Sequence, residues 1–202
     1  MNDLGKICTG KIKIQQPTCP WWFLFTFDNP LRKVYQDPKK ILAPYINQGD
    51  IAVDLGCGMG YFSIPLASLV GDTGQVICVD LQLEMLSGLQ KRALRAGLAE
   101  RINLHQCTQE QIGVRGPVDF VLAFWMVHEV RLRKKFLDQI YKMLKDGGSL
   151  LIAEPYLHVS GRSFQQMQAE LLECGFSRIE NPRIGFSRSI LVQKDKGARS
   201  WK

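Results

Sequence analysis

The stretch IAVDLGCGMG, residues 51–60, decides the fold of this chain. Ile51–Leu55 has the composition of a buried strand, and glycines follow it at positions 56, 58 and 60. Glycine allows a tight turn and a close approach of the backbone to a ligand. Residues 61–70 continue as a helix, whose first amide groups would face that ligand. The stretch therefore predicts a strand, turn and helix that bind a nucleotide-like molecule.

Strands and helices alternate outward from this unit. Apolar runs predict strands at 75–80, 101–105, 119–124 and 149–153, while apolar residues with helical spacing predict helices at 83–96 and 132–144. Residues 38–46 predict a short helix before the glycine turn, and Ser163 with Gln166 predicts a capping box that opens a helix ending near Cys174. The runs at 176–181 and 186–193 are too close for an intervening helix and favour an antiparallel hairpin.

The first 40 residues differ in composition from the rest of the chain. Trp21, Trp22 and several phenylalanines lie between prolines 20, 30 and 38, a pattern unsuited to a long helix. These aromatic side chains must cover apolar surface, either the domain's own core or the mouth of a pocket. We therefore divide the chain into an aromatic arm or lid, 1–40, and one α/β domain, 41–202. Trp21 and Trp22 are candidate substrate contacts.

Composition limits the class of protein. The 202 residues are 46% hydrophobic and 22% charged, as expected for a globular domain, and no signal peptide or long apolar span is present, so we expect a cytoplasmic protein. Six cysteines without a CxxC pair predict reduced, mostly buried thiols and no metal site, although Cys8 and Cys19 could be exposed. The net charge of +7 leaves nucleic acid as a less favoured partner than a small molecule and says nothing about oligomeric state.

An acidic residue at the end of the next strand narrows the kinds of nucleotide-binding site that the chain could form. Asp80 ends the next predicted strand, twenty residues after Gly60. A carboxylate at that place can accept hydrogen bonds from both hydroxyl groups of a ribose. The nicotinamide fingerprint requires a third glycine where this chain has Tyr61, and a P-loop requires a lysine followed by serine or threonine after the turn. Neither pattern is present.

Four segments in order then suggest a family: DLGCGMG at 54–60, Asp80, VDFVLAFWMVHEV at 118–130 and LKDGGSLLIAEP at 144–155. Together they resemble class I S-adenosylmethionine-dependent methyltransferases, particularly the small-molecule type such as the ubiquinone and menaquinone methylases. The resemblance covers about residues 40–193. It implies a Rossmann-like three-layer sandwich with a seven-stranded sheet, parallel except for the last strand, and S-adenosylmethionine as cofactor.

The resemblance also assigns the cofactor site. It places the methionine part against the backbone of the glycine turn and the ribose on Asp80. The adenine would contact residues that follow the second and third predicted strands. Relatives have an aspartate after the third strand, where this chain has Thr108, so that contact is a departure. The implied cofactor-binding residues are Asp54, Gly56, Cys57, Gly58, Gly60, Asp80, Leu81, Met85, Thr108, Gln109, Ala123 and Phe124.

Methyl transfer is an in-line displacement, in which good positioning alone can supply about 7–11 kcal/mol. An acceptor atom that starts protonated also needs a base, for which His128 is the candidate, although it could merely cap the strand end. Glu154 could hold substrate or orient a loop. Trp125 could offer an aromatic face to a sulfonium or a cationic substrate. His105 and His158 are expected in loops or on the surface.

Relatives commonly have proline and aspartate after the segment that contains His128, whereas this chain has Arg131 and Arg133. These cations could steer an anionic substrate or form a solvated helix face. The sequence thus predicts methyl transfer from S-adenosylmethionine to a small, partly apolar acceptor. An RNA methyltransferase and a non-catalytic binding module with the same fold remain the alternatives.

Overall fold

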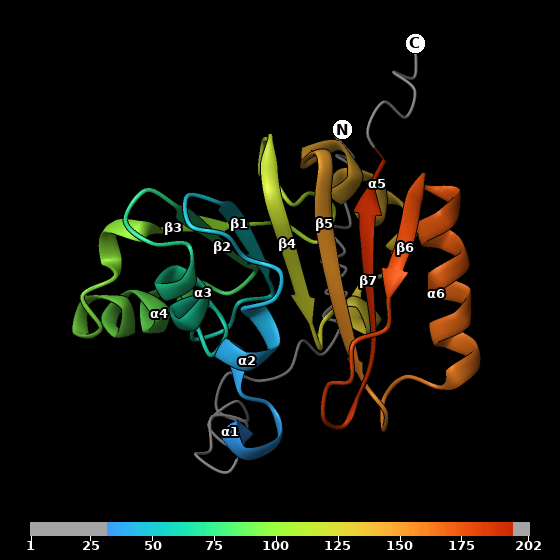
Figure 1. Ribbon diagram of the computed structural model, residues 1–202, viewed down its shortest axis with the longest axis horizontal. Helices are drawn as coiled ribbons and strands as arrows, with labels where there is room; N and C mark the ends of the chain where they lie inside the picture. The colour runs from blue at the N-terminus through green and yellow to red at the C-terminus, as the bar shows by residue number, and fades with distance from the viewer. Residues whose placement is uncertain (1–31, 196–202) are drawn as a thin grey trace, which may run out of the picture.

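A seven-stranded sheet forms the centre of the computed structural model, which describes residues 32–195 (Figure 1). The strand order is β3-β2-β1-β4-β5-β7-β6. β7 runs antiparallel to both of its neighbours, and the other pairs are parallel. The predicted fold, with its C-terminal antiparallel hairpin, is confirmed. The strands are β1 Ile51–Leu55, β2 Gln75–Asp80, β3 Ile102–Gln106, β4 Val118–Phe124, β5 Leu144–Pro155, β6 Phe176–Glu180 and β7 Ser187–Lys194.

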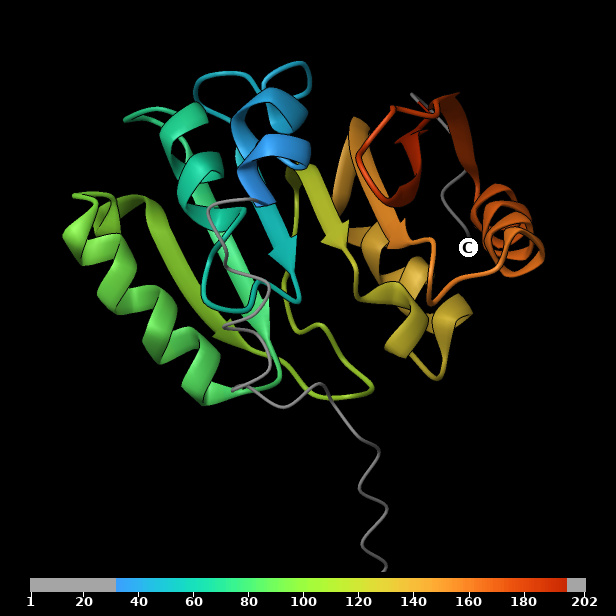
Figure 2. The ribbon, with the colours of Figure 1, turned by 90° about the horizontal axis from the view of Figure 1, so that it is seen from below.

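Helices cover both faces of the sheet, which makes three layers (Figure 2). One face packs against α2, α3 and α4, and the other against α5 and α6. The α-helices are α1 Arg32–Tyr35, α2 Pro38–Leu42, α3 Ser63–Leu69, α4 Leu83–Arg95, α5 Arg133–Met143 and α6 Gly161–Glu173, and the 3-10 helices are η2 Ala99–Arg101 and η3 Val127–Glu129.

Side-chain alternation along the central strands explains this layering. In β1, Val53 and Leu55 face the cluster that contains α5 and α6, whereas Ala52 faces the cluster that contains α3 and α4. Each of these three side chains is at most 1% exposed. Successive residues of a strand point to opposite faces, so a strand covered on both sides must be apolar almost throughout.

Several predicted boundaries were wrong. Helix α6 begins at Gly161, and its N-cap is Ser160, whose Oγ accepts a hydrogen bond from the Ser163 amide at 3.2 Å. Ser163 therefore donates to the cap instead of forming it. The helix after the glycine turn begins at Ser63, and the one expected at 38–46 ends at Leu42. The fifth strand begins at Leu144, five residues before the predicted start, and its register with β4 is irregular there.

Residues 1–31 and 196–202 lie outside the described part of the chain, and with them Trp21, Trp22, Cys8 and Cys19. The predicted boundary at residue 40 falls within α2, so the arm and the domain share that helix. The described cysteines are free thiols: Cys57 and Cys78 are buried, while Cys107 and Cys174 are partly exposed.

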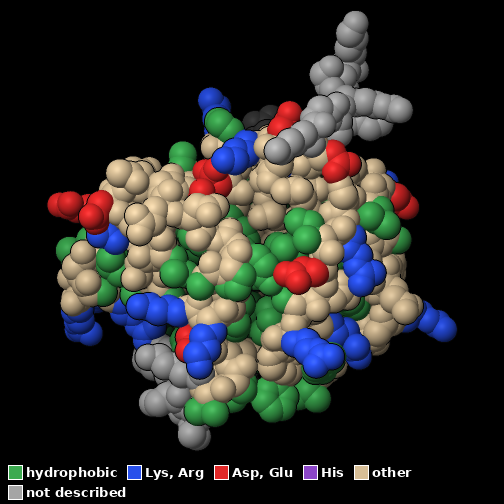
Figure 3. Space-filling model, in the orientation of Figure 1, with side chains coloured by type: hydrophobic (Ala, Val, Ile, Leu, Met, Phe, Trp, Pro, Cys, Tyr) green, Lys and Arg blue, Asp and Glu red, His purple; other side chains and the backbone are tan. Residues whose placement is uncertain are grey.

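Within residues 32–195, no helix combines the length and apolarity needed to cross a membrane. Figure 3 shows one face of the molecule, on which Lys and Arg side chains are interspersed with acidic and apolar ones.

Gly60 tests the packing of the glycine turn. Its φ is +87°, and a Cβ there would lie 2.2 Å from Cδ1 of Leu89 in α4. Gly97 is the matched control, because its φ is +67° but no atom lies within 4 Å of the same position. Both alanine variants lose about 1–2 kcal/mol from the left-handed backbone. In urea unfolding, we expect Gly60→Ala to lose about 1–3 kcal/mol more from overpacking. Equal losses would show that α4 does not confine the turn.

Candidate functional site

A cavity of about 1210 Å³ opens at the carboxyl ends of β1, β2 and β4. The strand order reverses between β1 and β4, and ligands of open α/β sheets bind at such a reversal. The described residues that line the cavity come from the ends of β1, β2, β4 and β5, the glycine turn and the two residues after it, the segments after β3, β4 and β5, helices α1, α4 and α5, and Phe186 before β7. The predicted cofactor region and the predicted base therefore lie in one space.

The glycine turn presents backbone to this cavity. The amides of Gly56 and Cys57 both donate to the carbonyl of Val79, at 2.8 and 3.1 Å, which ties the turn to the end of β2. Gly56 and Gly58 have φ of +67° and +53°. No atom lies within 4 Å of the position that a Cβ would take at Gly58, so the turn is open on that side.

Asp80 joins the turn to the second strand. Its Oδ2 accepts from the Gly58 amide and its Oδ1 from the Gln82 amide, both at 2.9 Å. Burial raises the pKa of Asp80, and the hydrogen bonds from the Gln82 and Gly58 amides offset part of that rise. A carboxylate oxygen has two lone pairs, so each oxygen can accept one further hydrogen bond from a ligand in the cavity.

Asp54 lies deeper, and only 2% of its surface is exposed. Its Oδ2 accepts from the hydroxyl of Ser63, the first residue of α3, at 2.6 Å. Burial raises the pKa of Asp54 to about 7, although the Ser63 hydrogen bond lowers it in part. A cationic group in the cavity would favour the ionised carboxylate.

Most of the other predicted cofactor residues line the cavity. Thr108 is held in a turn, in which its amide donates to the Gln111 carbonyl and its Oγ1 accepts from the Gln111 amide. Gly60 and Ala123 are absent from the lining: Gly60 packs against α4, and Ala123 is fully buried within the sheet. The predicted residues that do line it are Asp54, Gly56, Cys57, Gly58, Asp80, Leu81, Met85, Thr108, Gln109 and Phe124.

A buried carboxylate holds the loop after β4. Glu154, at the end of β5, is 1% exposed, and its Oε1 accepts from the Val127 amide at 2.8 Å. Its Oε2 lies 2.5 Å from Nδ1 of His128. His128 lines the cavity, whereas Glu154 is absent from the lining. Of the two roles considered for Glu154, the geometry favours orienting the loop and the imidazole.

The surroundings of His128 favour its protonated form. Burial lowers the pKa of the imidazole, but the hydrogen bond and charge of Glu154, together with the charge of Glu129, outweigh this effect and raise the pKa overall. The Nδ1 atom is engaged with Glu154, which leaves Nε2 as the nitrogen that can exchange a proton with another molecule.

His158 was missed as a site residue. It lines the cavity, and its ring centroid lies 5.5 Å from that of His128. Thirty residues separate the two histidines in the sequence, so no local pattern could pair them. His105 belongs to β3, as the strand predicted at 101–105 requires, and it is absent from the cavity lining.

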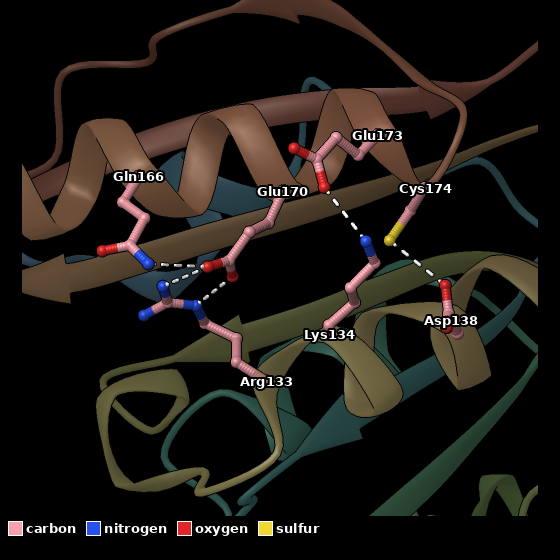
Figure 4. A network of polar contacts seen from close by, with 7 residues as sticks. All are labelled: Arg133, Lys134, Asp138, Gln166, Glu170, Glu173 and Cys174. Atoms are coloured by element: carbon pink, nitrogen blue, oxygen red, sulfur yellow. Dashed lines mark hydrogen bonds and ion pairs between the residues drawn. The ribbon is translucent and has the colours of Figure 1, made fainter.

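Arg131, which precedes α5, and Arg133, the first residue of α5, have different surroundings. Arg131 lines the cavity, whereas Arg133 forms a bidentate ion pair with Glu170 of α6, at 2.5 and 2.8 Å (Figure 4). Lys134 pairs with Glu173 beside it. Cys174, the C-cap of α6, also donates to Asp138 of α5, and Gln166 donates to Glu170 within α6. Arg133 therefore fastens α5 to α6, and only Arg131 adjoins the site.

Trp125 also lines the cavity, immediately after β4. Its φ is 58°, a conformation that strains a bulky residue. Its amide donates to the Ala153 carbonyl at 2.7 Å, and its indole Nε1 donates to Ser187 Oγ at 2.8 Å.

Among residues 32–195, no three His, Cys, Asp or Glu side chains are grouped as metal ligands would be.

A family model described as a methyltransferase domain matches residues 46–193, which include the cavity's glycine turn, Asp80 and His128. The chain belongs to this family. The family implies S-adenosylmethionine as the methyl donor, which is the cofactor predicted from the sequence.

Curated methyltransferases match part of the chain. The ubiquinone/menaquinone biosynthesis C-methyltransferase UbiE of Haemophilus ducreyi is 31% identical over 110 residues, 54% of this chain and 42% of the relative. The demethylmenaquinone methyltransferase of Lactobacillus johnsonii is 32% identical over 110 residues, 54% of this chain and 45% of the relative. The chain thus matches less than half the length of these two relatives.

Solved structures support the fold. A SAM-dependent methyltransferase from Aquifex aeolicus superimposes with a TM-score of 0.79 at 22% identity, covering 88% of this chain and all of the other. A SAM-dependent O-methyltransferase from Thermotoga maritima gives a TM-score of 0.67 at 19% identity, covering 90% of this chain and 73% of that one.

The raised pKa of Asp54 makes stability depend on pH. Between about pH 4 and 7 the folded protein binds a proton at Asp54 that the unfolded chain releases. The stability gained from this proton is complete below the unfolded pKa and is lost as pH rises through the folded pKa. We expect the unfolding free energy of the wild type, relative to Asp54→Asn, to fall by a few kcal/mol from pH 4 to 8, at about 1.4 kcal/mol per pKa unit. Parallel curves in urea titrations would contradict this.

Proposed function

We propose that this protein transfers a methyl group from S-adenosylmethionine to a small, partly apolar acceptor. The observation that carries the proposal is the single cavity shared by the glycine turn, Asp80 and His128. Pockets for one drug-sized ligand measure about 300–1,000 Å³. The volume of about 1210 Å³ therefore leaves room for an acceptor beside a nucleoside cofactor.

The residues present fit the cofactor. Asp80 retains acceptor capacity for the ribose hydroxyls, and the open side of Gly58 admits a ligand against the backbone. Asp54 would pair with the amino group, and Phe124 would border the sulfonium. When bound, S-adenosylmethionine supplies an electrophilic methyl group.

His128 would remove the proton that the acceptor loses. The Nδ1–H group of His128 remains hydrogen-bonded to Glu154, so Nε2 accepts the proton. The carboxylate of Glu154 then stabilises the resulting imidazolium. An acceptor carbon, oxygen or nitrogen that starts protonated needs this step. The relative from Haemophilus ducreyi is named a C-methyltransferase, which supports an acceptor that must lose a proton.

We assign the acceptor to the part of the cavity that contains His128. Apolar and aromatic side chains that line the cavity and could contact such an acceptor are Trp125, Leu132, Phe136, Tyr156 and Leu157. Arg131 adds a cation at its edge. A partly apolar acceptor with a polar or anionic group fits this lining better than a strongly polar one. Transfer of labelled methyl groups to fractions of a cell extract would test the class: label in RNA would favour an RNA methylase, and no label would favour a binding module.

Asp80 tests the cofactor site. The Asp80→Asn variant places an NH₂ or a neutral oxygen where the carboxylate accepts, and hydrogen bonds to a charged group contribute about 1.5–3 kcal/mol. We expect S-adenosylhomocysteine to bind about 10–100-fold more weakly in isothermal titration. Asp72→Asn is the control, because Asp72 is an exposed aspartate paired with Arg101. Unchanged binding to the Asp80 variant would refute the cofactor assignment.

Glu154 tests the base. Since its charge and hydrogen bond raise the pKa of His128, Glu154→Gln lowers that pKa. The acid limb of kcat/KM, measured on an acceptor identified by label transfer, should therefore move to lower pH. His128→Gln should cost about 10²–10⁴-fold in rate. Glu173→Gln, which changes only a surface ion pair with Lys134, is the control. An acid limb that stays in place in the Glu154 variant would exclude His128 as the titrating base.

A further inference from the structure

Gln36, between α1 and α2, makes three side-chain hydrogen bonds, although nothing in its sequence context marks it. Its side chain is 0% exposed. Its Nε2 donates to the Gly185 carbonyl at 2.7 Å and to Ser187 Oγ at 3.4 Å, and its Oε1 accepts from Arg32 Nε at 2.9 Å. The amide thus links the start of the described chain to the residues that open β7.

Ser187 carries this contact to the cavity. Its Oγ accepts from the Trp125 indole at 2.8 Å and from Gln36, and it donates to the Gly185 carbonyl at 3.2 Å. A hydroxyl has one proton and two lone pairs, so this arrangement uses all of its capacity. Ser187 is 3% exposed, and water therefore has little access to replace these partners.

Arg32 connects Gln36 to Trp125 by a second route. Its guanidinium carbon lies 5.0 Å from the Trp125 ring centroid and 4.2 Å from that of Tyr61. The Tyr61 hydroxyl donates to the Gln36 carbonyl at 2.8 Å. Tyr61 directly follows the last glycine of the turn. Tyr61, next to the glycine turn, and the Trp125 indole therefore contact the same buried cation.

Backbone strain marks the same place. Among residues 32–195, the only non-glycine residues with positive φ are Trp125 at 58° and Phe186 at 56°. Both are aromatic and both line the cavity. Such conformations persist only where the surroundings hold them, and they cluster at functional sites. The contacts made by Gln36, Ser187 and Arg32 hold this part of the chain in place.

We infer that Gln36 is a positioning residue, which acts through Ser187 and Arg32 to hold the Trp125 indole against the cavity and to couple its position to the glycine turn. The inference rests on the proposed function for the identity of the ligand at the turn. Ligand binding at the turn then changes the environment of Trp125, and by linkage an acceptor that contacts Trp125 changes the affinity for that ligand.

The test replaces the four tryptophans by 5-fluorotryptophan and follows the Trp125 signal by fluorine NMR, assigned with Trp125→Phe. Ser187→Ala removes the partner of the indole. Ser189→Ala is the matched control, because Ser189 lies on the same strand, donates to the Pro182 carbonyl and is absent from the cavity lining. Gln36→Leu removes the side-chain hydrogen bonds of Gln36 to Arg32, Gly185 and Ser187. Each protein is measured alone and with S-adenosylhomocysteine.

We expect Ser187→Ala and Gln36→Leu to shift or broaden the Trp125 signal and to reduce its response to S-adenosylhomocysteine by at least half. Affinity for S-adenosylhomocysteine should change less than about fivefold, since Asp80 and Gly58 are untouched. The control should match the wild type. A Trp125 signal in Ser187→Ala that equals the control, alone and with ligand, overturns the inference, whether or not Gln36→Leu folds.

Failure of the wild type to bind S-adenosylhomocysteine would contradict the proposed function. The signals of the unliganded variants would still decide the positioning role, because the contact between Ser187 and Trp125 exists without ligand.

Discussion

The parallel pairing of β1 with β2 on one side and β4 on the other is the constraint on which the site depends. It brings three strand ends to one edge of the sheet and leaves a gap above β1, into which the glycine turn folds. The register of β2 on β1 lets the Val79 carbonyl receive two amides of the turn, and it places Asp80 where a third amide reaches its carboxylate. The cavity is thus a consequence of strand order before any side chain is considered.

Three buried acids at this edge of the sheet differ in their hydrogen-bond partners. Asp80 is held by backbone amides, whereas Asp54 relies on one hydroxyl group and becomes easier to protonate because burial disfavours its charge. Glu154, more deeply buried than Asp80, instead has an amide and an imidazole as partners. These differences underlie the three roles that we propose: Asp80 accepts hydroxyl groups, Asp54 pairs with a cation, and Glu154 orients a base.

Local signals in the sequence predicted the parts of the site that lie within one segment. The glycine turn, Asp80 and the strand ends could be placed because spacing along the chain determines them. The roles of Glu154 and His158 could not be decided, since they depend on which strand ends are neighbours. Gln36 and Ser187, separated by 151 residues, carry no motif. The cap at Ser160 was missed because two serines three residues apart compete for the same pattern.

Strand β7 lies inside the sheet although it comes last among the strands, between β5 and β6. Its first residue, Ser187, is the partner of the Trp125 indole, and its pairing with β5 includes Glu154 opposite Arg188. During synthesis on the ribosome, the glycine turn is made before β7. The contact between Ser187 and the Trp125 indole can therefore form only after every other strand of the sheet has been synthesised.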